Sequence, residues 1–289
     1  MDYGTVSTRT FVLLGIGAAL FLIVPVVISI IWKKKKKEPY TTVLIGAATF
    51  IVFVVVEKII QGFFISDANA LGTFINARPI LWAFTVGFFP GIFEETGRLV
   101  AFKTLLKKRK QRETSISYGL GHGGVAEVSV IMTYSMITYI IYAVMINSGE
   151  IATIVDQVKE LAPSQLSQVE SVIKQLTEFS GLSLLTMMIE RVFAVMFHVG
   201  ASILVFYACK DKKKFWLYPL AVVLHGLIDM FGGLMLAGVI SIPNWAFEVV
   251  FAIASSLIFF GAYFLLYRKD KTEPVLKETV PAEGTDIGD

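Results

Sequence analysis

The stretch that decides the fold is Pro79-ILWAFTVGFFPGIFEETGRLVAF-Lys103. It is long and apolar enough to cross a membrane, yet Glu94, Glu95 and Arg98 interrupt it. Membrane-insertion experiments give the lowest values for the cost of a charged residue near the centre of a membrane helix, and even these are about 2.5–3.5 kcal/mol. Such residues therefore face a polar interior and mark a functional site. The stretch predicts a helical membrane protein with a polar site inside the bilayer.

The rest of the 289-residue chain has the same character, since 55% of its residues are hydrophobic and its mean hydropathy is +0.69. Apolar runs of about 20 residues or more recur along it, which soluble domains do not carry. The composition therefore excludes a soluble globular protein and predicts an all-α polytopic membrane protein. The single cysteine, Cys209, closes an apolar segment and is expected to pack rather than react.

Apolar length and flanking charge predict about seven transmembrane helices. They are expected at about 10–32, 40–64, 79–102, 116–146, 182–209, 215–239 and 245–267. The net charge of +3 is less informative than its placement, because basic residues follow every second span, at 33–37, 103–112, 210–214 and 268–271. Lys and Arg concentrate in cytoplasmic loops, so the N-terminus is predicted outside and the C-terminus in the cytoplasm. We interpret the lysines at 33–37 as a stop-transfer cluster rather than a nucleic-acid site.

These spans divide the chain into four regions. Residues 1–78 hold two N-terminal transmembrane helices, 79–240 a bundle with the intramembrane polar residues, 241–270 the last transmembrane helix, and 271–289 a disordered cytoplasmic tail. An external insert at 147–181 has apolar residues at helical spacing around Pro163. This pattern predicts two short amphipathic helices that pack at the membrane interface, with a lid over the bundle as the alternative.

The only histidines of the chain, His122, His198 and His225, lie in three different apolar segments. An α-helix rises about 1.5 Å per residue, so the distance from the nearest basic cluster estimates the depth of a residue in the membrane. Glu95 and the three histidines all come out roughly 12–18 Å from the predicted cytoplasmic charges. A single buried histidine is usually a packed core residue. Three of them at the depth of the carboxylates predict one shared cavity.

Glu94 and Glu95 precede Arg98 by four and three residues, so either carboxylate can pair with the guanidinium on one helix face. The other carboxylate is then left as a candidate general base. A structural Glu–Arg pair that braces the bundle is the alternative, although bracing needs only one carboxylate. Gly87 and Gly91 form a small face that allows another helix to approach closely.

Three further segments supply polar partners. The sequence YGLGHGGVAE at 118–127 matches G-x-G-x-x-G literally, but no strand precedes it, so it is not a dinucleotide fingerprint. Its glycines are expected to let another helix approach His122, and Glu127 adds a third buried carboxylate. The fifth span carries Glu190 and Arg191 besides its histidine. His225 and Asp229 are four residues apart, a spacing at which the carboxylate fixes the tautomer of the imidazole.

Taken in order, these segments resemble the four motifs of the CAAX-protease and bacteriocin-processing (CPBP, or Abi) superfamily of intramembrane proteases. The motifs are FEETGR at 93–98, GHGG at 121–124 with Glu127, His198, and HGLID at 225–229. The likeness is greatest to the YhfC branch of membrane metalloproteases and covers about 90–230. It implies that the bundle at 79–240 is the catalytic unit.

The chain also departs from the prenyl-protein endoproteases of that superfamily. It has EExxR where those enzymes often have EExxxR, and Asp229 where they have Asn. Tyr118 stands four residues before His122, where those enzymes have Phe. The first departure leaves open which glutamate is the base.

The resemblance implies a role for each candidate residue. Glu94 or Glu95 would activate water, Arg98 would hold the other glutamate, and Asp229 would orient His225. The three histidines, His122, His198 and His225, would bind zinc or another divalent metal or stabilise the oxyanion. The zincin motif HExxH is absent, so a metal-free mechanism with a glutamate and a histidine stays open.

The expected function is hydrolysis of a membrane-embedded or membrane-delivered peptide or protein, by a multi-pass enzyme of the bacterial plasma membrane. Its expected partners are this substrate and the lipid bilayer, with no nucleic acid. Two alternatives remain: a proton- or metal-coupled transporter that uses the same residues as a relay, and a non-catalytic immunity or scaffold protein. No inverted repeat is visible, and polar residues at a single depth disfavour a conduction path.

Overall fold

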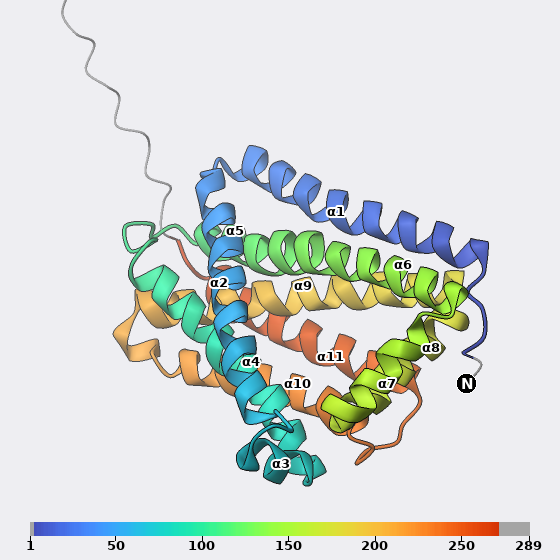
Figure 1. Cartoon of the computed structure of the whole chain (residues 1–289). Helices are drawn as coiled ribbons and strands as arrows, with labels where there is room; N and C mark the ends of the chain where they lie inside the picture. The colour runs from blue at the N-terminus through green and yellow to red at the C-terminus, as the bar shows by residue number, and fades with distance from the viewer. Residues whose placement is uncertain (1–2, 272–289) are drawn as a thin grey trace, which may run out of the picture.

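Residues 3–271 are described by the computed structural model, and within this range all regular structure is helical. The prediction of an all-α fold is confirmed. The elements in chain order are α1 (Thr8–Lys36), α2 (Tyr40–Phe64), α3 (Ala70–Asn76), α4 (Pro79–Lys103), α5 (Glu113–Gly119), η1 (Leu120–Met132), α6 (Thr133–Ser148), α7 (Ile151–Leu161), η2 (Pro163–Gln165), α8 (Leu166–Thr177), α9 (Gly181–Lys210), η3 (Lys212–Lys214), α10 (Leu217–Leu236), α11 (Asn244–Ala262) and η4 (Tyr263–Tyr267) (Figure 1). Of the predicted tail at 271–289, all but the first residue lie outside the described range.

Six helices of the described chain are long and apolar enough to cross a membrane. They are Thr8–Lys36, Tyr40–Phe64, Glu113–Ser148, Gly181–Lys210, Lys212–Leu236 and Asn244–Tyr267. The chain is therefore a multi-pass membrane protein. The seventh expected span, α4, is a continuous helix of 25 residues but is not among the six, because Glu94, Glu95 and Arg98 lower its hydropathy.

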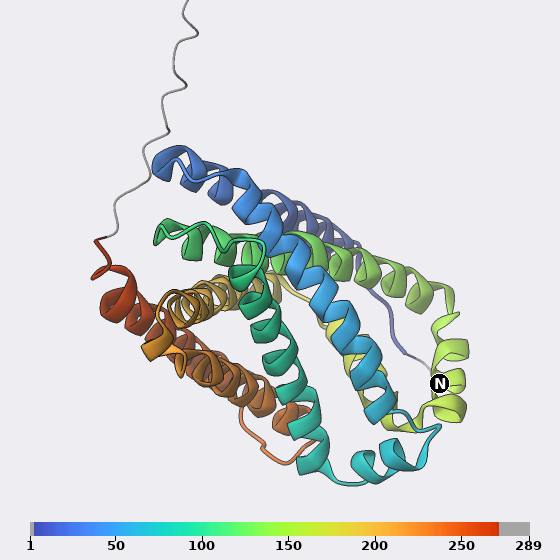
Figure 2. The ribbon, with the colours of Figure 1, turned by 90° about the vertical axis from the view of Figure 1, so that its left-hand side faces the viewer.

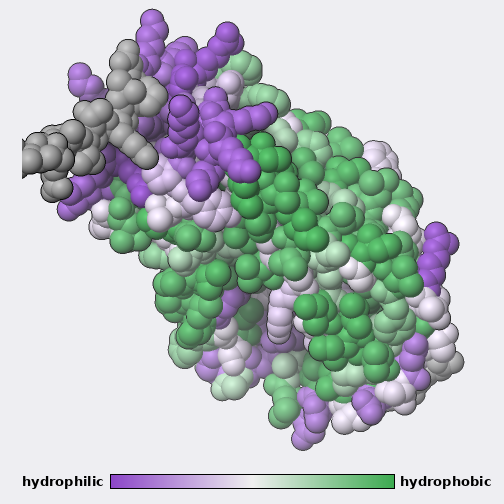
Figure 3. Space-filling model, turned by 90° about the horizontal axis from the view of Figure 1, so that it is seen from above, coloured by the Kyte–Doolittle hydropathy of each residue, from purple (hydrophilic) through white to green (hydrophobic). Residues whose placement is uncertain are grey.

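The four basic clusters meet at one end of the bundle, which we call the basic end. Two hydrogen bonds connect three of them, from Lys210 to the carbonyl of Lys110 (2.9 Å) and from Arg112 to the carbonyl of Asp270 (3.0 Å). Arg109 also donates to Thr41 Oγ1 (2.7 Å), four residues after the cluster at 33–37. Hydrophilic side chains gather at this end, and much of the surface beyond it is hydrophobic (Figure 3). The opposite end, where α7 and α8 lie, is called the distal end (Figure 1). That the basic end faces the cytoplasm stays a prediction.

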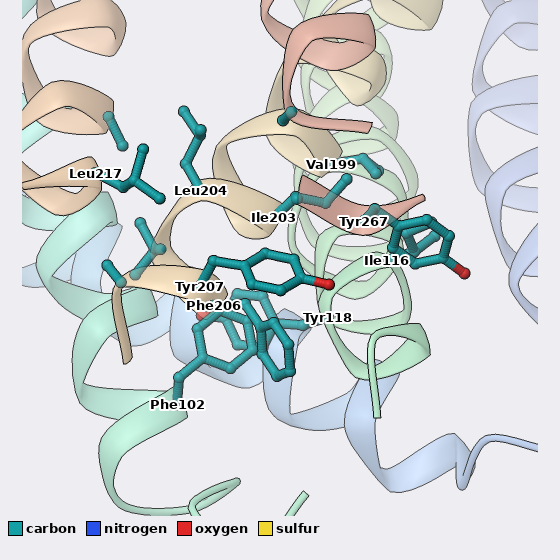
Figure 4. Close-up of a cluster of buried hydrophobic side chains, with 14 of the residues drawn as sticks. Phe102, Ile116, Tyr118, Val199, Ile203, Leu204, Phe206, Tyr207, Leu217 and Tyr267 are labelled. Carbon is teal, nitrogen blue, oxygen red and sulfur yellow. The ribbon is translucent and has the colours of Figure 1, made fainter. Parts of the chain in front are cut away.

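A hydrophobic core lies between α4, α5, α9 and α10 near the basic end (Figure 4). The ring of Phe102 lies 4.7 Å from that of Tyr118 and 5.4 Å from that of Phe206. Inside a bilayer, where lipid is as apolar as these side chains, such a core stabilises the fold through packing rather than removal from water. It fixes three helices one turn away from Arg98, His122 and Ser202, and so positions the polar residues.

The insert forms the two short helices that its periodicity predicts, α7 and α8, joined by a short turn at Pro163–Gln165. Val155 on α7 and Leu176 on α8 are buried in a second hydrophobic cluster together with Met136 of α6. The opposite faces of both helices are exposed, as expected of amphipathic helices. Their position at an external membrane surface stays a prediction.

Helices α2 and α4 cross the other long helices steeply, and α4 packs along α10 (Figure 2). The small face predicted on α4 makes this contact. A Cβ atom at Gly87 would lie 2.3 Å from the backbone nitrogen of Met230, and one at Gly91 would lie 2.8 Å from that of Gly226. No side chain fits at such distances, so the glycines let the two backbones approach. The contact brings His225 on α10 beside the glutamates of α4.

Candidate active site

The centre of the site is a buried ion pair between Glu95 and Arg98, one turn apart on α4, with neither side chain exposed. Arg98 Nε donates to Ser202 Oγ on α9 at 3.2 Å. A second guanidinium nitrogen, Nη2, donates to Nδ1 of His198 at 2.6 Å. Burial of a charge is costly unless it is paired and hydrogen-bonded. Arg98 meets this condition with three partners from two helices.

Glu94 has different surroundings from its neighbour. Its Oε2 accepts from His122 Nε2 at 3.0 Å and lies 3.9 Å from both His198 Nδ1 and His225 Nε2. Glu94 lines the main cavity of the bundle, whereas Glu95 does not. One carboxylate is therefore fixed by Arg98, and the adjacent one faces the cavity and all three histidines.

The three histidines come from three different helices, η1, α9 and α10, and all are buried. Their ring centroids lie 5.1 Å apart for His122 and His198, and 5.6 Å apart for His198 and His225. Aromatic edges pack against them, with Phe50 at 4.6 Å from His122 and Phe197 at 4.9 Å from His225. The clustering predicted from their common depth is present, although only His198 and His225 of the three line the cavity described below.

Both ring nitrogens of His225 face carboxylates. Nδ1 lies 2.8 Å from Glu95 Oε1, and Nε2 lies 3.4 Å from Asp229 Oδ2, the residue four positions further along α10. Because an ionised carboxylate can only accept, His225 donates to Glu95. The predicted contact between His225 and Asp229 is present, and Glu95 is a second carboxylate that orients the same ring.

His198 contacts Glu127, which is not among the site residues predicted from the sequence. Since the guanidinium of Arg98 can only donate, His198 Nδ1 accepts and Nε2 carries the proton. That nitrogen lies 2.6 Å from Glu127 Oε2, and Glu127 Oε1 accepts from Arg191 at 2.7 Å. Arg191 also pairs with Glu190. Glu127 and Arg191 therefore belong to the site.

Both additional residues leave a signal in the sequence. Arg191 precedes His198 by seven residues, two helical turns, and so shares its face of α9. Glu127 follows His122 by five residues, which in an α-helix points elsewhere. Residues 120–132 form a π-helix, however, and hydrogen bonds from i to i+5 place residues five apart above one another.

The glycines around His122 allow the close approach that the sequence predicts. A Cβ atom at Gly123 would lie 2.6 Å from Cβ of His198, and one at Gly121 would lie 2.0 Å from the carbonyl oxygen of Val43 on α2. These glycines seat His122 between α2 and α9.

Gly121→Ala is expected to destabilise the protein, because its new methyl group would overlap the backbone of α2 at Val43. Overpacking of this kind costs about 1–3 kcal/mol, equivalent to a fall of about 2–10 °C in the unfolding midpoint. Gly124→Ala is the matched control, since its Cβ would meet only Pro25 at 3.5 Å, an ordinary contact. Thermal unfolding of both purified variants measures the difference. Equal midpoints would show that the close approach at Gly121 is not needed.

A cavity of about 500 Å³ leads to these side chains. Its wall carries the carboxylates of Glu94, Glu127, Glu190 and Asp229 together with Arg191. This volume lies within the range of pockets that bind small ligands, about 300–1,000 Å³.

Glu94, His122 and His198 each offer a ligand atom within 4.8 Å of the others. Two imidazoles and one carboxylate are a donor set of catalytic zinc sites. His122 Nδ1 is also buried without a hydrogen-bond partner among the described residues. The residues therefore fit a divalent metal in kind and spacing. As the side chains lie, both nitrogens of His198 are engaged, so ligation by His198 requires release from Arg98 or Glu127.

This group differs from the predicted ligands, His122, His198 and His225, in one member. Glu94 takes the place of His225, which is held by Glu95 and Asp229. Ligation by His225 stays a prediction.

The chain is similar to known membrane proteins. The chain matches the YhfC intramembrane metalloprotease family over residues 20–251. It is 27% identical over 258 residues to a Bacillus subtilis (strain 168) protein named "Uncharacterized membrane protein YhfC", covering 87% of this chain and 95% of that protein. No solved structure matches the chain. Since the family match extends over most of its length, the chain belongs to the YhfC intramembrane metalloprotease family.

Proposed function

We propose that the protein is an intramembrane peptidase that hydrolyses a membrane-embedded or membrane-delivered peptide or protein. The observation that carries the proposal is that two adjacent glutamates have different contacts. Arg98 and His225 hold Glu95, whereas Glu94 faces the cavity beside His122. A purely structural ion pair with Arg98 would need only Glu95, so it leaves the position of Glu94 unexplained. The order of the motifs supports a wider placement in the CPBP superfamily.

In this proposal Glu94 is the general base. Its Oε2 faces His122, so Oε1 is the oxygen left to take a proton from a water molecule in the cavity. The water oxygen bonds to the scissile carbonyl carbon, the C–N bond breaks, and the proton on Glu94 passes to the leaving amine. A positioned base contributes about 10²–10⁴-fold to the rate.

The surrounding residues orient the reacting groups. Arg98 is a positioning residue, because it holds Glu95 and His198 without lining the cavity. His225, fixed by Glu95 and Asp229, presents its Nε2 edge toward Glu94. A divalent ion bound by His122, His198 and one carboxylate oxygen of Glu94 would polarise the carbonyl and lower the pKa of water to about 7, and the other oxygen of Glu94 would remain the base.

The proposed function is tested in cells that express either the wild-type protein or Glu94→Gln at equal levels. Mass spectrometry of protein termini in the membrane fraction should find cleavage sites that occur only with the wild type. An identical set of termini in both cells would remove the support for a peptidase and favour a transporter or scaffold.

Purified protein is expected to retain about one equivalent of zinc or a similar divalent ion, and His122→Ala to lose it. Elemental analysis before and after a membrane-permeant chelator measures the metal. His225→Ala separates the two ligand sets, because it retains metal if Glu94 is the third ligand and loses it if His225 is. In the second case Asp229→Asn should weaken retention on the order of 10–100-fold. Chelator-insensitive cleavage by metal-free protein would assign water activation to Glu94 and a histidine alone.

A further inference from the structure

The cavity that reaches the histidines has its outer wall at the distal end of the bundle. This wall is formed by Ile65 just after α2, Trp82 near the start of α4, Leu236 at the end of α10 and Gln168 on α8. Among the described residues, no lysine or arginine of the four basic clusters lines the cavity. The cavity therefore extends from the site toward the end of the bundle that lacks these clusters.

The length of this path follows from helix geometry. Eleven residues of α10 separate His225 from Leu236, which corresponds to about 16 Å. In the other direction, toward the basic end, the helices are packed by the core of Phe102, Tyr118 and Phe206 (Figure 4). Access from the basic end is thus closed by side chains, while the path to the distal end is open over roughly half of a bilayer.

The wall of this path is polar enough for a peptide backbone. Glu190 and Arg191 form an ion pair on it, and Asp229 is partly exposed there. A hollow with hydrophilic side chains in its depth is visible between hydrophobic parts of the surface (Figure 3). A peptide bond that leaves water loses hydrogen bonds, so a polar wall lowers the cost of its entry.

Two segments near the distal opening of the cavity, which we call the mouth, are joined by hydrogen bonds of Asp67, which we call the clasp. Asp67, between α2 and α3, accepts from the backbone nitrogen of Ser164 at 3.2 Å, from Ser164 Oγ at 2.6 Å and from Asn76 at 2.7 Å. Slight burial acts to raise the pKa of Asp67, but the hydrogen bonds from Ser164 and Asn76 outweigh it and lower the pKa. The clasp is therefore intact at neutral pH and is lost only as the pH falls through this lowered value. It holds the α7–α8 hairpin, which supplies Gln168, beside the mouth.

We propose that the site receives its substrate from the face opposite the basic clusters, which the positive-inside rule makes the extracytoplasmic face. The substrate is then a peptide segment on that side of the membrane, such as a juxtamembrane segment of a membrane protein, and it enters beside the α7–α8 hairpin. That the entering segment is cleaved rests on the proposed peptidase function, whereas the access route does not depend on that function.

Single cysteines in a Cys209→Ala background test the route. Ile65→Cys near the mouth and Ile228→Cys deep in the cavity should react with a membrane-impermeant maleimide in intact cells. Leu105→Cys, which is 64% exposed at the basic end, should react only after permeabilisation. The reverse pattern, or failure of Ile228→Cys to react from outside, would overturn the proposal. Because labelling needs no turnover, its result is independent of whether the protein cleaves peptides.

The clasp provides a second arm of the same experiment. Asp67→Ala should raise the labelling rate of Ile228→Cys, because the hairpin is then no longer held beside the mouth. One hydrogen bond is typically equivalent to about a fivefold shift of an equilibrium, so loss of the two from Ser164 should raise the rate by at least about fivefold. Asp156→Ala is the matched control, since within residues 3–271 this exposed carboxylate of α7 pairs only with Lys159. Equal rates in both variants would show that the hairpin does not border the route.

Discussion

Glu94→Gln is expected to lower the rate of peptide cleavage by about 10²–10⁴-fold and to leave folding intact. The amide keeps the shape of the side chain but cannot take a proton from water. Glu95→Gln, His198→Ala and His225→Ala should also lose activity, because each removes a contact that orients the cluster. Initial rates on a peptide found by terminus mapping measure the effect.

The control for Glu94→Gln is Glu190→Gln, another carboxylate on the cavity wall, whose partner is Arg191 and not a histidine. It should change the rate less than about tenfold. If Glu94→Gln itself kept more than about a tenth of the wild-type rate, Glu94 could not be the base.

Arg98→Met is expected to destabilise the protein by about 3–5 kcal/mol, because it leaves the carboxylate of Glu95 buried and without its counter-ion. It also removes the donors to Ser202 and His198. A loss of this size corresponds to a fall on the order of 10 °C in the unfolding midpoint of the purified protein.

The double variant Glu95→Gln/Arg98→Met separates the ion pair from the packing of the arginine side chain. Removal of both charges should restore much of the stability, since the cost arises mainly from one unpaired charge. A single variant as stable as the wild type would contradict the central role of this pair. A double variant no better than the single would assign the loss to packing instead.

The fold was largely predictable because apolar length alone specifies membrane helices. Helix α4 is the exception. The charges that made 79–103 the most informative stretch also lower its hydropathy, so α4 is the one expected span that does not qualify by composition. Its place in the fold depends on Gly87 and Gly91, whose backbone contacts with α10 no hydropathy measure records.

The clustering of the glutamates of α4 with the three histidines was predictable from depth, but the pairing within the cluster was not. Glu94 and Glu95 are both within reach of Arg98 on one helix, and local spacing cannot choose between them. The choice depends on His225, 130 positions away from Glu95, whose Nδ1 contacts that carboxylate. A contact between distant segments therefore decides which glutamate faces the cavity.

Glu127 shows a second limit of local patterns. Its distance of five residues from His122 suggests different faces, as long as the segment is assumed to be an α-helix. The π-helix at 120–132 changes the angle per residue and brings both side chains toward the same cluster. No residue type in YGLGHGGVAE predicts that this segment forms a π-helix.

Cleavage in ¹⁸O-labelled water tests the proposed function most directly. Purified protein is incubated with solubilised bacterial membrane proteins, and new C-termini are examined by mass spectrometry. Hydrolysis places one labelled oxygen from water in each new carboxyl group, so the wild type should yield labelled termini that Glu94→Gln does not, while Glu190→Gln should still yield them. The absence of labelled termini with folded wild-type protein, or equal amounts with Glu94→Gln, would contradict an intramembrane peptidase that uses Glu94 as its base.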